Sequence, residues 1–355
     1  MRCDSEEVVQ LLKMPLRQCS SSVFLPDHDT SQAPSAQLSQ RKLIFMEYRS
    51  LGSTDLKVSS LGMGTAAQGL RYGADPVEPP PAAGSIRLLR RAAELGINYF
   101  DTAPAYGDIE PVVGEALEPI RPRPVIGTKL SISDQDTPFT GDELRNRLSA
   151  SVDESLRKLR LECIDLMQIH SVLPPFVNDE LLETMDGISN SGRVRYWGVT
   201  TYGEEAPLEA LTAGGRFRTV QIAYSALDRT LERRVIPRLH EQGVGLILRS
   251  MFLQGALSPV WTKLPEQLQD LRGACSQVAT LAEQTGVSMS ELALRYAAFQ
   301  PRPAVAVFGT LSMDEIDANV ARIEAGPLPA DVIDALERIT VEDESQLNPG
   351  TWGHL

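Results

Sequence analysis

The stretch that decides the fold is residues 97–107, which read Ile-Asn-Tyr-Phe-Asp-Thr-Ala-Pro-Ala-Tyr-Gly. A short apolar run opens it directly after Gly96, a residue that typically ends a helix, and Asp101 closes that run. The pattern predicts a strand that breaks into a loop. An acid at the tip of a buried parallel strand, followed in the loop by Tyr106, fits the mouth of an α/β barrel, where such enzymes carry their chemistry. The alternative is a capping Asp101 and a core Tyr106, and this stretch alone favours the functional interpretation only slightly.

Composition limits the class of protein. With 355 residues, 42% of them hydrophobic, the chain can bury a large core. One barrel of about 250 residues with extensions fits this length as well as two domains. The net charge of −13 and the lack of a basic block argue against nucleic acid or an anionic membrane as a partner. The four cysteines lie far apart without a CxxC spacing, which favours free thiols in a reducing compartment over a disulfide framework or a zinc site. We therefore expect no bound metal.

The N-terminal part of the chain differs in character from the rest. Residues 1–45 are rich in Ser, Gln, Asp and Pro without a sustained apolar period, which predicts a disordered extension. They also lack the apolar stretch of a secretory signal, and the chain has no run long enough to span a membrane. We therefore expect a cytoplasmic protein, as a monomer or small homo-oligomer. From Met46 the pattern changes, and we predict a folded domain over 46–355 that opens with a β-hairpin around Gly52–Asp55.

Beyond the hairpin the sequence repeats strand, loop and helix. Apolar runs alternate with helical segments such as 142–159, which has Leu144, Leu148 and Val152 on one face, and 231–242. The strands followed by helices have the spacing of a (β/α)8 TIM barrel, an α/β fold. A doubly wound sheet would instead carry a GxGxxG loop after an early strand, and none is present. The eight predicted strands lie at Leu61, Tyr99, Val125, Ile164, Tyr196, Val220, Gly245 and Ala304.

Several short motifs follow one another along these strands and loops. They are Gly62–Thr65, Phe100–Gly107, Gly127–Lys129, Asp165–His170, Gly198–Thr201, Gln221–Tyr224 and Gly309–Asn319. With this ordered set the chain resembles the aldo-keto reductase superfamily, roughly from residue 46 to residue 336. The resemblance implies a (β/α)8 barrel and a catalytic tetrad at strand ends, which in this sequence is Asp101, Tyr106, Lys129 and His170.

The chemistry of carbonyl reduction explains why such a quartet is needed. Hydride transfer to a carbonyl builds negative charge on its oxygen, so a donor must give up a proton as the alkoxide forms. Tyr106 is the candidate acid, and a nearby Lys129 would lower its pKa by favouring the phenolate. Asp101 would keep Lys129 charged and aimed, and His170 would donate to the same oxygen. Each residue has an ordinary structural alternative, but four ordinary residues at successive strand ends are improbable together.

The resemblance also implies a nicotinamide cofactor, NAD or NADP, that lies extended across the barrel mouth without a Rossmann unit. Thr200 and Thr201 stand where relatives carry a Ser-Asn pair. Arg249 stands where many relatives stack an aromatic residue on the nicotinamide. Its guanidinium could stack there instead or form a buried ion pair with a barrel acid, and the two alternatives are about even. The implied cofactor contacts are Gly64, Thr65, Asp101, Thr200, Thr201, Gln221, Arg249, Ser250, Leu253, Gly255, Gly309, Thr310, Ser312, Glu315 and Asn319.

The segment 308–319 bears on the choice between NAD and NADP. Relatives that use NADP place basic residues there, because the ribose 2′-phosphate needs charge-assisted donors. This chain has no Lys or Arg in the segment, and Glu315 stands where a phosphate-binding Arg is often found. A local alternative is that Ser312 and Glu315 form a capping box at the start of a helix. Both interpretations leave a site unfavourable to a dianion, so the sequence favours NAD.

Three functions remain open on the sequence. The first is a cytoplasmic nicotinamide-dependent reductase that converts an aldehyde, ketone or sugar carbonyl into an alcohol, with Tyr106 as proton donor. The second is a sugar dehydrogenase that oxidises a lactol hydroxyl with Tyr106 as base, since the loop 249–254 resembles that of family members in carbohydrate pathways. The third is a regulatory subunit that binds the cofactor but does slow chemistry, as some relatives attached to potassium channels do. The intact tetrad argues against the third.

Overall fold

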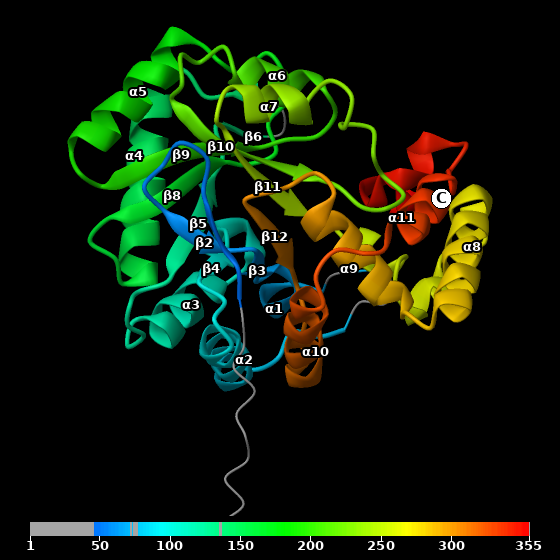
Figure 1. Cartoon of the computed structure of the whole chain (residues 1–355). Coiled ribbons are helices and arrows are strands. Elements are labelled where there is room, and N and C mark those ends of the chain that lie inside the picture. Colours follow the sequence, from blue (N-terminus) through cyan, green and yellow to red (C-terminus); the bar gives the residue numbers. More distant parts are fainter. Residues whose placement is uncertain (1–45, 72, 74–76, 135–136, 355) are drawn as a thin grey trace, which may run out of the picture. The chain divides into compact units, whose positions relative to one another are not determined.

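Eight parallel strands close into a barrel in the computed structural model, which describes residues 46–71, 73, 77–134 and 137–354 (Figure 1). Every predicted barrel strand is present, and the cyclic order β10-β11-β12-β3-β4-β5-β8-β9 is that of a (β/α)8 barrel. The predicted disordered extension, residues 1–45, lies outside the described residues. The strands are β3 (Leu61–Gly64), β4 (Tyr99–Asp101), β5 (Val125–Leu130), β8 (Ile164–Ile169), β9 (Val194–Thr200), β10 (Phe217–Ala223), β11 (Gly245–Arg249) and β12 (Val305–Phe308).

The barrel strands are buried on both faces. Every residue of β5 and β8 is buried, because helices cover the outside of a parallel barrel and side chains fill its inside. The register places Gly64 beside Asp101, and Asp101 beside Gly127. It also places Lys129 beside Gln168. The carboxyl ends of β3, β4, β5 and β8 therefore meet at one rim of the barrel.

An antiparallel hairpin precedes the barrel, as predicted. It pairs β1 (Tyr48–Ser50) with β2 (Lys57–Ser59). Val58 belongs to one apolar cluster with Tyr99 and Val125, the first residues of β4 and β5. Burial of these side chains stabilises the hairpin against the amino ends of the barrel strands.

The hairpin turn makes the closest backbone approach to the barrel. Gly52 has φ of +58°, and a Cβ placed on it would lie 2.3 Å from the amide nitrogen of Gly245, the first residue of β11. Only glycine combines that backbone conformation with so short an approach. The neighbouring Leu51 is fully buried in the barrel cluster. The hairpin thus closes the amino end of the barrel.

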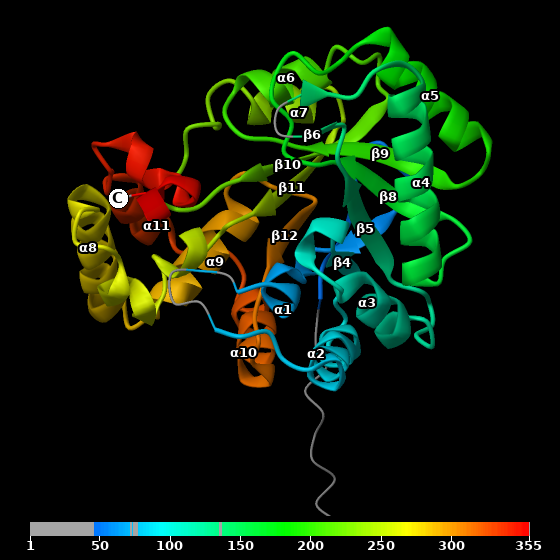
Figure 2. The same ribbon diagram turned by 180° about the vertical axis from the view of Figure 1, so that it is seen from behind.

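Helices surround the strands (Figures 1 and 2). The long helix α4 buries Leu144, Leu148 and Val152, the apolar face predicted for it, and carries acidic residues in its first turn and basic residues in its last, which suits the helix dipole. α8 packs against α11 near the carboxyl end of the chain. The α-helices are α1 (Ala66–Gly69), α2 (Ala82–Glu94), α3 (Ile109–Leu117), α4 (Gly141–Leu159), α5 (Asp179–Asn190), α6 (Glu205–Ala210), α7 (Ile236–Glu241), α8 (Gln269–Thr285), α9 (Met289–Phe299), α10 (Met313–Glu324) and α11 (Ala330–Glu337).

Short elements complete the chain. The pair β6 (Ser133–Asp134) and β7 (Thr137–Pro138) forms a small hairpin beyond β5. The 3-10 helices are η1 (Pro104–Tyr106), η2 (Leu253–Gly255), η3 (Pro259–Lys263), η4 (Glu344–Leu347) and η5 (Pro349–His354).

One predicted helix is shorter than expected. The segment 231–242 is helical only over α7, and residues 231–235 form turns. Pro237 stands in the first turn of α7, where its missing N–H costs nothing. Further back in a helix the same proline would clash with the preceding turn. The proline therefore sets the start of the helix.

Within the residues that the structure describes, no helix is both long and apolar enough to cross a membrane. Over the same residues no group of three or more His, Cys, Asp and Glu side chains is arranged to hold a metal ion. Cys163 and Cys275 are free thiols.

Candidate active site

The four predicted catalytic residues lie at the carboxyl rim of the barrel. Asp101 is the last residue of β4, Lys129 is the second-last residue of β5, and His170 directly follows β8. Tyr106 ends η1, the short 3-10 helix that begins at Pro104, a residue whose fixed φ suits a helix start. The neighbouring strands β4, β5 and β8 carry three of these side chains, so the barrel itself sets their spacing.

The four side chains converge on the Lys129 ammonium. Its Nζ donates to Asp101 Oδ1 at 2.5 Å and to the Thr102 carbonyl at 2.9 Å. The same Nζ lies 4.9 Å from the centroid of the Tyr106 ring. The His170 ring stands edge-on to Tyr106, with centroids 5.8 Å apart and an interplanar angle of 84°. The structure therefore brings the whole predicted quartet together.

Two amides hold Asp101 from its other oxygen. Gln221 Nε2 donates to Oδ2 at 2.7 Å, and Gln168 Nε2 donates to the same atom at 3.3 Å. Asp101 is 5% exposed and Lys129 is 1% exposed, and a charge pair buried this deeply needs such further hydrogen bonds. The sequence analysis did not single out Gln168. Gln168 and Asp165 are the two polar residues of strand β8, and a polar side chain in a strand that is buried throughout was the available signal.

The surroundings set the protonation states. Burial lowers the pKa of Lys129, but Asp101 and then Tyr106 outweigh it, so this pKa lies above its ordinary value. Burial raises the pKa of Tyr106, and Lys129 offsets only part of that rise. The expected lowering of the Tyr106 pKa by Lys129 is thus present as one influence but does not prevail. Burial, followed by the charge of Lys129, lowers the pKa of His170 to about 4, so its imidazole is neutral at pH 7.

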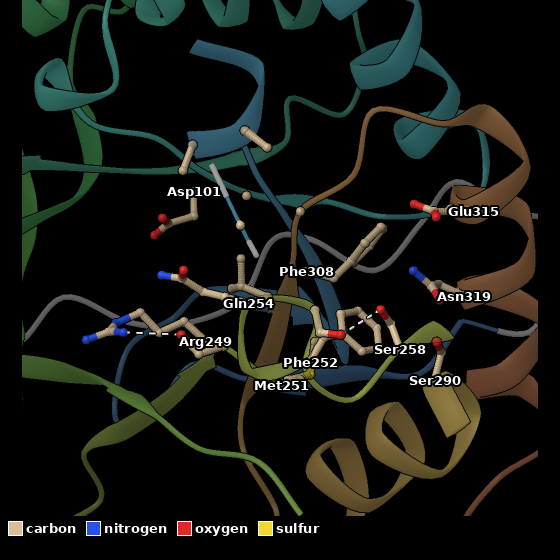
Figure 3. A pocket seen from close by; sticks show the side chains of 18 of the residues that line it. Asp101, Arg249, Met251, Phe252, Gln254, Ser258, Ser290, Phe308, Glu315 and Asn319 are labelled. Atoms are coloured by element: carbon tan, nitrogen blue, oxygen red, sulfur yellow. Dashed lines mark hydrogen bonds between the residues drawn. The ribbon is translucent and has the colours of Figure 1, made fainter. Parts of the chain in front are cut away.

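A pocket of about 550 Å³ opens beside the quartet (Figure 3). In that view Asp101 and Arg249 lie at one end and Glu315 and Asn319 at the other, so the pocket is elongated. Tyr106 also lines it. The predicted cofactor contacts that line the pocket are Gly64, Thr65, Asp101, Gln221, Arg249, Ser250, Gly255, Gly309, Glu315 and Asn319.

Five predicted cofactor contacts are absent from the pocket wall: Thr200, Thr201, Leu253, Thr310 and Ser312. The Thr200 hydroxyl accepts a hydrogen bond from the amide of Ser171 at 2.7 Å, and Leu253 is 2% exposed. Thr201 donates its amide to the Gln221 carbonyl at 3.0 Å, which fixes the strand end behind the pocket. That these five residues contact the cofactor stays a prediction.

The first turn of α10 differs in detail from the predicted capping box. Ser312 caps the helix by accepting from the amide of Glu315 at 3.4 Å. The Glu315 carboxylate accepts from the Thr310 hydroxyl, and that hydroxyl in turn accepts from the Ser312 amide at 3.1 Å. The glutamate thus reaches the capping residue through Thr310 instead of directly, because Thr310 lies between them. Arg322, which also lines the pocket, donates to Asn319 Oδ1 at 2.7 Å.

Among the described residues, Arg249 does not form the buried ion pair that was one of its two expected contacts, and its stacking on the nicotinamide stays a prediction. Its guanidinium lies over the Tyr202 ring, 4.3 Å from the centroid. It donates to the Ser250 hydroxyl and the Thr201 carbonyl, both at 3.3 Å. No carboxylate among the described residues lies within ion-pair distance of it, so the buried ion pair is not formed in this part of the chain. Tyr202 could not be predicted as a partner, because the contact joins the end of β11 to the loop after β9, which is distant along the chain.

Residues of the β11–α8 connection form much of the pocket wall, and several were not predicted as contacts. Met251, Phe252 and Ser258 line the pocket, as does Ser290 from α9 (Figure 3). The connection holds Ser250, Leu253 and Gln254 at positive φ, a backbone conformation that is unfavourable for residues other than glycine. Such strain is found most often where a loop must present its backbone to a ligand.

Known proteins resemble the chain in sequence and in fold. The family model described as "Aldo/keto reductase family" matches residues 60–341. The aldo-keto reductase YhdN of Bacillus subtilis (strain 168) is 28% identical over 295 residues, which cover 77% of this chain and 87% of the relative. L-galactose dehydrogenase of Arabidopsis thaliana is 28% identical over 303 residues, which cover 78% and 88% of the two chains.

A solved structure agrees with these sequence matches. The holo form of the aldo-keto reductase AKR11C1 from Bacillus halodurans superposes with a TM-score of 0.70 at 28% identity, covering 85% of this chain and all of that one. The family match spans most of the described residues and includes all four members of the quartet. The chain therefore belongs to the aldo/keto reductase family of oxidoreductases, whose general reaction is the NAD(P)-dependent reduction of a carbonyl group.

Proposed function

We propose that this chain reduces an aldehyde or ketone to the alcohol with a nicotinamide cofactor, and that Tyr106 is the proton donor. The observation that carries the proposal is the buried Lys129 ammonium, bound to Asp101 at 2.5 Å and lying 4.9 Å from the Tyr106 ring centroid. A phenol beside a buried cation at the edge of a pocket is the arrangement that proton donation to a developing alkoxide requires. The proposed setting is the cytoplasm, with small-molecule carbonyls or sugars as substrates.

Each member of the quartet has one task in this mechanism. The bound cofactor supplies the hydride. The neutral His170 donates an N–H to the carbonyl oxygen and orients it, since a protonated imidazole is not available at pH 7. Tyr106 gives its hydroxyl proton to the same oxygen as negative charge develops there. Lys129 stabilises the phenolate that remains, and Asp101 keeps Lys129 charged and aimed.

The residues present fit an extended dinucleotide. The pocket is elongated, with Asp101 and Gln221 towards the quartet and Glu315 and Asn319 at the far end. Gln221 uses its Nε2 on Asp101, so the amide oxygen is the atom that it can offer to a carboxamide. These residues would hold the nicotinamide at the quartet and the adenosine half near α10.

We also propose that NAD is bound at least as well as NADP. Segment 308–319 has no Lys or Arg, and Glu315 adds a carboxylate to this end of the pocket. Arg322 is the lining residue with a positive charge there, and one of its N–H donors is used on Asn319. A ribose 2′-phosphate would therefore gain few charge-assisted hydrogen bonds.

The test is turnover by the purified full chain. Loss of NADH or NADPH absorbance is followed over a panel of aldehydes, ketones and sugars, for the wild type and for Tyr106→Phe. The matched control is Tyr48→Phe, because Tyr48 is a half-exposed tyrosine in the hairpin whose hydroxyl binds the Gly96 carbonyl. Turnover that is lost in Tyr106→Phe and kept in Tyr48→Phe supports the proposal. A wild type that binds NADH but turns over nothing in either direction would instead be the cofactor-binding regulatory subunit.

A second candidate function is oxidation of a sugar lactol, with Tyr106 as base. The supporting observation is the likeness to L-galactose dehydrogenase of Arabidopsis thaliana, at 28% identity over 303 residues. The same quartet serves this direction, because proton transfer and hydride transfer both reverse. Growth of NADH absorbance with aldoses and oxidised cofactor, in the absence of aldehyde reduction, would favour this function over the first.

A further inference from the structure

Arg249 places a positive charge at the catalytic end of the pocket. It ends β11, lines the pocket with Asp101 and Tyr106, and lies at the Asp101 end in Figure 3. Burial is the largest influence on the pKa of His170, and the charge of Arg249 adds to the same lowering. For Tyr106, Arg249 likewise opposes the rise in pKa that burial causes. The guanidinium is thus close enough to act on both groups that would face the carbonyl.

The guanidinium is oriented but not neutralised. Its Cζ atom lies 4.3 Å from the centroid of the Tyr202 ring, a cation–π distance that holds the group beside this ring. Its hydrogen bonds to Ser250 and Thr201 are both 3.3 Å long. Arginine carries five N–H donors, so most of them have no partner in the part of the chain that the structure describes. Burial raises the pKa of Asp228, and the charge of Arg249 lowers it as a minor influence, but no ion pair joins the two residues.

The charges of the catalytic end do not cancel. Lys129 and Asp101 form a buried pair and offset each other. His170 is neutral at pH 7, and Glu315 lies at the opposite end of the pocket. Arg249 is therefore left as an uncompensated cation beside the reaction centre, in a chain whose net charge is −13. A cation in that position attracts an anionic group of a ligand. The net negative charge of the rest of the protein would otherwise repel that group.

We propose that Arg249 binds a carboxylate of the substrate, so that the preferred substrates are aldehydes or ketones that carry a carboxylate group. The inference rests on the carbonyl-reductase function proposed above and names the substrate class for the same site. An oriented guanidinium with free edge donors matches the two oxygens of a carboxylate through parallel hydrogen bonds. A neutral carbonyl compound uses neither the charge nor this fork. Tyr202 is then a positioning residue, which holds the plane of Arg249.

A matched pair of substrates isolates the carboxylate. The compounds 4-carboxybenzaldehyde and methyl 4-formylbenzoate share the same ring and a similar electron-withdrawing group, but only the first is charged. For the wild type we expect kcat/KM to favour the acid over the ester by tenfold or more, roughly the effect of one charge-assisted hydrogen bond. In Arg249→Met this ratio should fall by about 10- to 100-fold, and in Arg249→Lys, which keeps the charge but loses the planar fork, it should fall less.

The control and the readout are chosen to separate charge from position. Arg234→Met removes the same charge from an exposed arginine that is paired with Glu204, and its acid-to-ester ratio should stay within about twofold of the wild-type ratio. Tyr202→Leu should lower the ratio, whereas Tyr202→Phe, which keeps the ring, should not. Because each result is a ratio of two substrates for one variant, a general loss of activity in Arg249→Met does not affect it.

The possible outcomes distinguish this inference from the function on which it rests. A wild-type ratio near one, or a ratio that Arg249→Met leaves unchanged, overturns the carboxylate site while turnover itself keeps the reductase function. If neither compound is reduced and the panel of aldehydes, ketones and sugars also shows no turnover, the reductase function fails. Calorimetric titration of 4-carboxybenzyl alcohol in the presence of NADH then decides the site: tenfold weaker binding in Arg249→Met than in the wild type supports it, and equal binding overturns it. Weaker NADH binding in Arg249→Met with an unchanged ratio also overturns it, and assigns Arg249 to the cofactor.

Discussion

Gln221 and Lys129 hold opposite oxygens of the same carboxylate. The amide of Gln221 donates to Asp101 Oδ2 at 2.7 Å, and the ammonium of Lys129 donates to Oδ1 at 2.5 Å. Asp101 is therefore fixed between β10 and β5, the strands that carry its two partners. Because this carboxylate aims the lysine, we expect a side chain outside the pocket that holds Asp101 to influence Tyr106, the proposed proton donor.

Gln168→Met tests this indirect control. Gln168 donates to Asp101 from Nε2, while its Oε1 is buried without a partner in the described part of the chain, and it does not line the pocket. Methionine has a similar shape, and removal of the unsatisfied acceptor offsets the loss of the long 3.3 Å hydrogen bond to Asp101, so thermal stability should change little. With one support of Asp101 lost, kcat should fall severalfold while the dissociation constant for NADH stays the same. A drop in melting temperature without a change in kcat would show that Gln168 only fills the barrel.

Tyr106→Phe removes the proposed proton donor and keeps the ring. Turnover should fall by about a hundredfold or more, since general acid catalysis contributes roughly that much, and cofactor affinity should be nearly unchanged. The measurement is steady-state reduction of the best aldehyde, with NADH binding followed separately. Activity equal to that of the wild type would contradict the assignment of Tyr106 as the proton donor. His170→Gln, which retains some donation to the carbonyl, should lose less than Tyr106→Phe.

Lys129→Met should move the basic limb of the pH–rate profile. Lys129 opposes the rise in the pKa of Tyr106 that burial causes, so its removal leaves the phenol protonated to higher pH and shifts the limb upward. The variant also leaves Asp101 buried without its cation, at a cost to stability of roughly 3–5 kcal/mol. The double variant Lys129→Met/Asp101→Asn is the control. It should restore stability without returning the basic limb of the pH–rate profile to its wild-type pH. An unmoved limb in both variants would refute the coupling.

His170 should make the folded protein sensitive to acid. Its pKa is about 4 in the folded chain, below the ordinary value of 6.5. Above the ordinary value both states are neutral at this site, and the contribution to stability is complete. As the pH falls towards 4, the unfolded chain takes up a proton that the folded chain excludes, so the free energy of unfolding drops by up to about 1.4 kcal/mol per pH unit.

The measurement for this prediction is urea denaturation between pH 7 and pH 4.5. His170→Gln has no proton to take up, so its unfolding free energy should fall less steeply than that of the wild type over this range. Other titrating groups are the same in both proteins and cancel in the difference. Parallel pH profiles would show that the imidazole has the same pKa in the folded chain as in the unfolded chain.

The choice of cofactor should be visible in a side-by-side titration. Each hydrogen bond to a charged group contributes about 1.5–3 kcal/mol, so the missing cations in 308–319 should remove the usual preference for the 2′-phosphate. Glu315→Arg should tighten NADPH binding relative to NADH. Glu315→Gln is the control, because it removes the negative charge without adding a cation. A wild-type dissociation constant for NADPH tenfold below that for NADH would mean that another cation, such as Arg322, reaches the phosphate.

The barrel could be predicted from the sequence because its strands are buried on both faces. Several strands, such as β12, then read as short apolar runs, and a polar residue that ends a strand or follows it marks the rim, as Asp101 and His170 do. The start of α7 was placed too early because apolar spacing continues through 231–235, although Pro237 favours a helix that begins beside it. The local sequence pattern therefore predicts the presence of a helix or strand more reliably than the residues at which it begins and ends.

The parts of the site that could not be predicted depend on contacts between distant segments. Arg249 meets Tyr202 because β11 and the loop after β9 are brought to one rim, and no spacing in the sequence records this. The positive φ angles at Ser250 and Gln254 have no glycine signature either, since ordinary residues occupy them. Thr200 is predicted to contact the cofactor, and the sequence does not indicate that its hydroxyl also accepts from the Ser171 amide. Its role depends on which atoms arrive beside it in the folded chain.

The hairpin turn at Gly52 keeps water out of the amino end of the barrel, and the predicted catalytic quartet lies at the opposite end. The Lys129–Asp101 pair interacts strongly because water is kept away from it. The packed cluster around Leu51 and Tyr99 prevents water from entering at the amino end of the barrel. A side chain at position 52 would push the turn from Gly245 and let water reach the interior hydroxyl of Tyr99, which has no hydrogen-bond partner among the described residues. The higher dielectric would weaken the hold of Lys129 on its carboxylate. A substitution remote from the pocket would then act on catalysis by wetting the barrel.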